Sequence, residues 1–81
     1  MDVLLLANNW PGLQITEYLR AQGENIVGLG IHAPDKQRLT SEIIAASGVP
    51  PDRIFEGPAL REATTVQRIR EWQPEIIVGA F

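Results

Sequence analysis

The chain of 81 residues contains no cysteine. This excludes a disulfide framework, a thiolate metal site and a cysteine nucleophile, and it favours a reducing compartment such as the cytoplasm. Long apolar runs are also missing. The longest, Val3 to Ala7 and Ile76 to Phe81, fall far below the roughly 20 residues that cross a bilayer, and Met1-Asp2 lacks the positive charge that opens a signal peptide. We therefore predict a cytoplasmic protein with no membrane partner.

Positive charge is scarce as well. Lysine and arginine total 7 against 10 for aspartate and glutamate, a net charge of −3, and the cations are scattered, so we predict no nucleic-acid partner. A single histidine among dispersed carboxylates excludes a zinc site of three or four converging ligands.

A hydrophobic fraction of 44% is typical of a folded chain. The length allows one small domain, residues 1–81, with no second core.

Apolar segments and helical patterns alternate along the chain. Strands are predicted at Val3–Ala7, Asn25–Ile31, Ile54–Phe55 and Ile76–Phe81, and helices at Pro11–Gln22, Lys36–Ser47 and Glu62–Gln73. Continuous apolar strands are typical of parallel sheets buried on both faces, whereas the short third strand is flanked by charge and suits a sheet edge. In the second strand Gly28 and Gly30 alternate, which indicates close packing over one face.

This alternation predicts an α/β fold. Each helix must return the chain to the same end of the next parallel strand, through a right-handed crossover. We expect a small three-layer, Rossmann-like, doubly wound parallel sheet with four strands in the order 3-2-1-4 and three helices. In the third helix Val66, Ile69 and Trp72 recur at three-residue intervals and mark its core face.

The loop after the first strand is the candidate binding site. In open parallel sheets ligands bind beyond the carboxyl ends of the strands where strand order reverses, here between the first and fourth strands. This predicts a substrate site at Asn8, Asn9, Trp10 and Gly12, where amides beside a helix N-terminus could bind a phosphate, a carboxylate or a ring amide. The two asparagines could equally serve turn and cap geometry, and Trp10 could be a wedge at the helix start. With one glycine between Ala7 and Gly12, the fingerprint for a nicotinamide or flavin cofactor is absent.

His32 is the sole histidine in the chain. Histidine is the side chain best suited to act as a general base near neutral pH, so His32 is the candidate for that role. Asp35, three residues away across a proline, is a poor assistant. We interpret His32 as a surface residue rather than a catalytic one.

Several segments together resemble the N-terminal half of the folate-dependent formyltransferase family. They are Met1–Trp10, Gly12–Leu19, Ile26–Leu29, Glu42–Pro50, Leu60-Arg61 and Gln73–Ile77. The resemblance covers the whole chain and implies a relative of enzymes that move a formyl group from 10-formyltetrahydrofolate to an amine. In that family the amine belongs to glycinamide ribonucleotide, methionyl-tRNA or a nucleotide-linked amino sugar. The resemblance also implies that the loop from Asn8 to Gly12 faces the amine substrate or its phosphate.

The family's catalytic residues have no counterpart in this chain. In the family an Asn, a spacer and a His, with an Asp on a later strand, lie beyond the fourth strand, as does the loop that holds the pterin. The resemblance therefore implies a truncated formyltransferase N-terminal-like domain that has no catalytic residue, binds no folate cofactor by itself and is not catalytic alone.

Two other interpretations remain open at this point. One is a small structural or binding module that self-associates, and the other is a phosphate- or nucleotide-binding module without chemistry. The predicted edge from Ile76 to Phe81 has no charge and no proline to discourage pairing with another strand. We therefore expect a homo-oligomer, a symmetric dimer formed through this edge.

Overall fold

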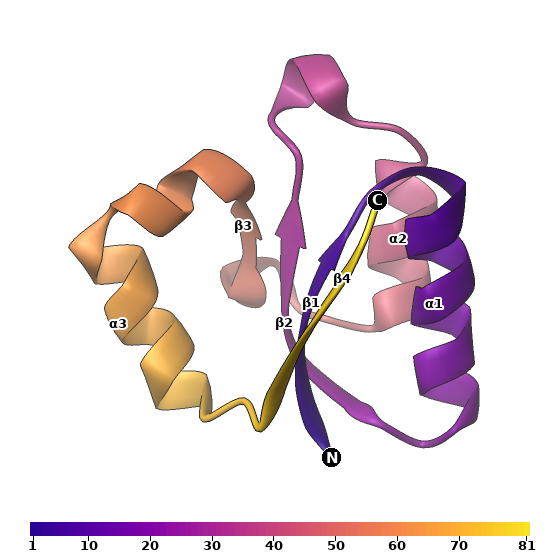
Figure 1. The fold of residues 1–81 in the computed structure, drawn as a ribbon, viewed down its shortest axis with the longest axis horizontal. Helices are drawn as coiled ribbons and strands as arrows, with labels where there is room; N and C mark the ends of the chain where they lie inside the picture. The colour runs from indigo at the N-terminus through magenta and orange to yellow at the C-terminus, as the bar shows by residue number, and fades with distance from the viewer.

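A four-stranded parallel sheet forms the centre of the computed structural model, which describes residues 1–81 (Figure 1). Its strands are β1 (Asp2–Ala7), β2 (Asn25–Ile31), β3 (Ile54–Glu56) and β4 (Ile76–Ala80). The helices are α1 (Asn9–Ala21), α2 (Thr40–Ser47) and α3 (Ala63–Trp72). The strand order is β3-β2-β1-β4, which confirms the predicted Rossmann-like α/β fold and places β3 at an edge. None of the helices has the length and apolar character that a membrane span requires.

The predicted start of the second helix at Lys36 is wrong. Pro34–Lys36 forms a separate 3-10 turn, and α2 begins only at Thr40. Between them Leu39 has a φ of 56°, in the left-handed region that a helix cannot pass through. The other two helices agree with the prediction to within two residues at each end, because their apolar patterns and terminators act locally.

The main core lies between the sheet and the helix pair α1 and α2. Alternate residues of β1 point to opposite faces, so Val3, Leu5 and Ala7 all face these helices. Leu19, Ile26, Leu29, Ile43 and Val49 complete the buried cluster. The chain can approach closely here because Gly12 has no side chain: a Cβ at this position would lie 3.0 Å from the Ala7 Cβ and 3.1 Å from the Ala80 carbonyl oxygen. Gly12 thus allows α1 to pack directly on β1 and β4.

The opposite face of the sheet is only partly covered. Helix α3 lies on this side, against β2 and the 3-10 turn Gly57–Arg61, and none of its residues is fully buried (Figure 1). The predicted core residues of α3, Val66, Ile69 and Trp72, are half-buried. Trp72 rests on β2 at Gly28, where a Cβ would lie 2.5 Å from the indole, and Phe55 and Leu6 cover Gly30. The close packing predicted from these two glycines is confirmed.

Strand β4 is consequently exposed on the side of α3. It pairs with β1 alone, and Ile77, opposite Leu4 in that pairing, is 62% exposed. Phe81, just past the end of β4, is also 62% exposed. The sheet therefore presents an apolar, unpaired edge to solvent.

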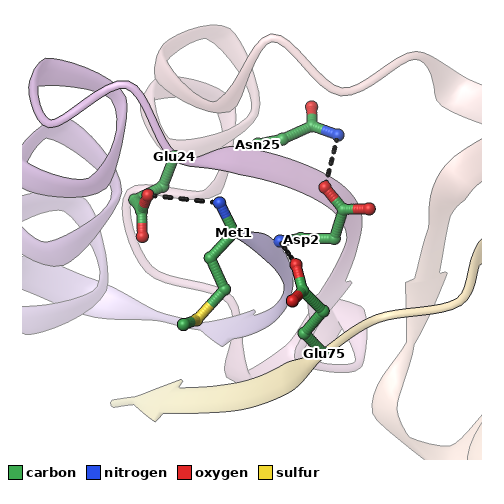
Figure 2. Close-up of polar contacts among 5 residues, drawn as sticks. All are labelled: Met1, Asp2, Glu24, Asn25 and Glu75. Carbon is green, nitrogen blue, oxygen red and sulfur yellow. Dashed lines mark hydrogen bonds and ion pairs between the residues drawn. The ribbon is translucent and has the colours of Figure 1, made fainter.

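Polar contacts tie the strands together at their amino ends (Figure 2). The Asp2 amide donates to Glu75 Oε1 at 2.8 Å, and Asn25 Nδ2 donates to Asp2 Oδ1 at 3.1 Å. The N-terminal ammonium of Met1 forms an ion pair with Glu24 at 3.4 Å. These exposed contacts hold the beginnings of β1, β2 and β4 in register, at the end of the sheet away from the candidate site.

Candidate functional site

The predicted site residues all lie on the turn that leads from β1 into α1. Asn8 separates the two elements, Asn9 is the first residue of α1, and Trp10 and Gly12 follow in its first turn. Asn8 and Gly12 are buried, whereas Asn9 and Trp10 are exposed, Trp10 by 60%. Only Asn9 and Trp10 therefore offer side chains to a ligand at this turn.

Asn8 joins this turn to the loop that precedes α2. Its side-chain Nδ2 donates to the Lys36 carbonyl oxygen at 3.2 Å, and its Oδ1 accepts a hydrogen bond from the Arg38 amide at 2.9 Å. The Asn9 amide adds a bond to the Arg38 carbonyl oxygen at 2.9 Å. Asn8 makes no side-chain capping bond to α1, so its amide acts as a cross-link between two loops.

Replacing Asn8 with alanine should lower the free energy of unfolding by about 2 kcal/mol, because the Lys36 carbonyl and the Arg38 amide each lose a partner. Chemical denaturation measures this change. The matched control is Asn25→Ala, which removes an exposed side-chain bond to Asp2 and should change stability by no more than about 0.5 kcal/mol. Equal losses in the two variants would contradict the cross-linking role.

The two joined loops each contain a residue other than glycine with left-handed backbone. These are Asn9, with φ 63°, and Leu39, with φ 56°. Asparagine tolerates this region better than leucine does, and such residues concentrate at functional sites. The Asn8 cross-link holds both loops, so Asn9 and Trp10 project from a fixed backbone.

The N-terminus of α1 has few free hydrogen-bond donors. The Asn8 amide donates to the Ala80 carbonyl oxygen at 3.0 Å, and the Asn9 amide is bound to Arg38. Pro11 has no N–H at all. Of the unpaired amides that usually draw an anion to a helix start, at most that of Trp10 is available here. A ligand at this turn must rely on the Asn9 amide side chain and the Trp10 ring.

A pocket that the sequence did not predict opens at the same end of the sheet, on the side of α3. Its volume is about 180 Å³. Its lining includes Leu6, Ile31, His32, Gly57, Leu60 and Phe81. These residues come from the ends of β1 and β2, the turn before α3, and the residue after β4. The sequence signal for this pocket was the pair of apolar residues, Leu6 and Ile31, at the ends of neighbouring strands. Leu60 and Phe81 lie beside them only because the chain folds in this way.

His32 forms part of this pocket wall. Its ring stacks on that of Phe81, with 5.2 Å between the centroids and 27° between the planes. Its Nδ1 is buried and has no hydrogen-bond partner, while its backbone carbonyl accepts a bond from Gln37 Nε2 at 3.1 Å. His32 is therefore half-buried against an aromatic neighbour rather than freely exposed, and its interpretation as a residue without a catalytic role stays a prediction.

The turn from Asn8 to Gly12 and the pocket beside His32 together contain amide, indole and imidazole groups. No carboxylate bonds to His32 Nδ1, so the paired arrangement of an activated histidine is not formed. No group of three or more histidine, aspartate or glutamate side chains lies together as a metal site would require.

Models of known protein families give no match to this chain, and no curated protein matches it.

Proposed function

We propose that this chain is an N-terminal formyltransferase-like domain that is not catalytic alone. It would be related to enzymes that transfer a formyl group from 10-formyltetrahydrofolate to an amine. The observation that carries the proposal is the turn from Asn8 to Gly12, held rigidly at the point where the strand order reverses between β1 and β4. The sequence resemblance to that family supports it.

The residues present support the proposal that this chain is not catalytic alone. No asparagine in the chain is followed two positions later by a histidine, so the family's catalytic signature has no match. His32 stacks on Phe81 and has no acidic partner. In this proposal the turn contacts the phosphate or amide side of an amine substrate, through Asn9 and Trp10. The formyl donor belongs to longer members of the family.

Two measurements test the proposal. Incubation with 10-formyltetrahydrofolate and glycinamide ribonucleotide should give no formylation above the uncatalysed rate. Addition of ribose 5-phosphate should shift the backbone amide resonances of residues 8–13 first, at millimolar concentration, because little ligand surface can be buried at an open turn. Turnover that disappears on substitution of His32 would overturn the first expectation.

Asn9→Gly is the discriminating variant for the binding measurement. Glycine adopts the left-handed φ of Asn9 without strain, so the variant removes the side-chain amide and keeps the turn. We expect weaker ribose 5-phosphate binding with unchanged stability. Shifts confined to other regions, or binding that the variant does not alter, would argue against a site at this turn. Binding of inorganic phosphate as tight as that of ribose 5-phosphate would favour a phosphate-binding module without chemistry.

The exposed edge favours a second function, self-association. β4 pairs only with β1, and the segment from Ile76 to Phe81 has no charged residue and no proline. Natural edge strands are normally protected by such residues. A symmetric dimer in which two β4 strands meet antiparallel would satisfy the open backbone groups and cover Ile77 and Phe81.

A further inference from the structure

The free edge of β4 is self-complementary in one register, and we propose that two copies of this chain pair there with the two-fold axis at Val78. This inference rests on the self-association proposed for β4. It adds which residues pair across the interface and which side chains meet. In this register Ile77 of each copy lies opposite Gly79 of the other.

The hydrogen bonds to β1 identify the free backbone groups of β4. The Ala80 carbonyl oxygen accepts a bond from the Asn8 amide at 3.0 Å, so the backbone of Ala80 faces β1. Successive residues of a strand direct their N–H and C=O groups to alternate edges, so Val78 also faces β1 while Ile77 and Gly79 face outward. No strand lies beyond β4, and these outward groups have no strand partner.

Only one antiparallel register uses all the outward groups of β4. With the axis at Val78, the N–H and C=O groups of Ile77 bond to those of Gly79 in the other copy, and the reverse pair forms by symmetry. An axis at Ile77 would instead place Gly79 opposite Glu75. The Glu75 amide is already engaged, because it donates to the Asp2 carbonyl oxygen at 2.8 Å.

The position of Phe81 argues against the remaining register, with the axis at Gly79. That register pairs Ile77 with Phe81, which lies beyond the last strand residue, Ala80. The Phe81 ring is also turned back over its own sheet, since it stacks on His32 with 5.2 Å between the ring centroids.

The Val78 axis also covers the two large apolar side chains with the highest exposure. Ile77 and Phe81 are each 62% exposed. Gly79 has no side chain, and a Cβ at that position would lie 3.6 Å from the Phe81 ring. Ile77 of the partner subunit, opposite Gly79, would therefore pack beside this ring. Because Phe81 lines the pocket that contains His32, each pocket would border the interface.

Single-cysteine variants locate the axis directly, because the chain has no cysteine of its own. Residues that face each other in a non-hydrogen-bonded antiparallel pair have Cα atoms about 4.5 Å apart, within the range of about 4.4–6.8 Å that a disulfide spans. Val78→Cys faces its own copy in this way, so mild oxidation should link two chains. Ile77→Cys and Gly79→Cys face each other rather than themselves. Each alone should cross-link at least about tenfold more slowly than Val78→Cys, whereas an equimolar mixture should give the mixed disulfide.

Gln14→Cys, on an exposed position of α1, sets the background rate of cross-linking by collision. Light scattering in reducing buffer should first give each variant the mass of the unmutated chain. A dimer in which Ile77→Cys or Gly79→Cys cross-links fastest would overturn the Val78 axis and leave self-association through β4 in place. A dimer in which all three β4 variants react at the Gln14→Cys rate would place the interface elsewhere. A monomeric unmutated chain at micromolar concentration would refute self-association itself.

Discussion

Replacing Leu5 with alanine is expected to lower the free energy of unfolding by about 3 to 4 kcal/mol. The Leu5 side chain has no exposed surface and lies in the cluster that joins β1 to α1 and α2. Removing it costs the transfer free energy of the lost carbons and leaves a cavity that packed neighbours such as Leu29 and Ile43 cannot fill. A core in a domain of this size typically supplies about 3–5 kcal/mol, so the variant should be close to unfolding. Urea denaturation followed by circular dichroism measures the change.

Leu6→Ala provides the matched control for this prediction. Leu6 is the next residue of β1 but points to the side of α3, where it is half-buried over Gly30. We expect its replacement to cost about 1 kcal/mol, since less of its surface is removed from water. Equal losses at Leu5 and Leu6 would contradict the unequal covering of the two sheet faces.

The chain is expected to be a dimer in solution, and Ile77→Lys is expected to raise its dissociation constant by at least about 100-fold. Ile77 is 62% exposed on β4 and would be covered when two β4 strands meet. A lysine there would remove an apolar contact and bring like charges together across the two paired strands, and charged side chains of this kind are what natural edge strands use to prevent pairing. Light scattering at micromolar concentration should give twice the mass of one chain before the substitution and the mass of one chain after it.

Two further variants locate the interface. Val78→Lys changes the neighbouring residue of β4, which points to the α1 side and is half-buried, and it should also weaken the dimer. Tyr18→Lys alters a side chain of comparable exposure, 58%, on α1, and it should leave the dimer intact. A folded monomer of the unmutated chain would refute self-association, and a dimer that resists Ile77→Lys would place the interface elsewhere.

The order of the elements was predictable because the patterns that specify it either lie within each segment or apply to all helix-linked parallel sheets. Continuous apolar strands such as Val3–Ala7 indicate burial on both faces, and parallel strands joined by helices require right-handed crossovers. The start of α2 was not predictable in this way. A leucine at position 39 carries no signal for left-handed backbone, and the contact of its neighbour Arg38 with Asn8 is between residues distant in the chain.

The candidate site was predictable in position but not in its contacts. Polar residues after the first strand of a doubly wound sheet indicate a binding loop, and the structure places Asn8, Asn9, Trp10 and Gly12 there. The sequence allowed two roles for the Asn8 side chain, namely ligand binding and capping of the helix that follows. Its partners are instead Lys36 and Arg38, which are 28 and 30 residues away along the chain.

The α/β class and the strand order could be read from the sequence, because apolar patterns and helix terminators mark each element locally and helix-linked parallel strands follow right-handed crossovers. Three features are visible only in the folded chain: the cross-link that Asn8 makes between two loops, the face of β4 that α3 leaves uncovered, and the pocket that His32 lines. These outcomes depend on which distant segments meet, how closely they pack, and which buried polar atoms then find partners. Such contacts are fixed only when the whole chain is folded, because no single segment contains both halves of any of them.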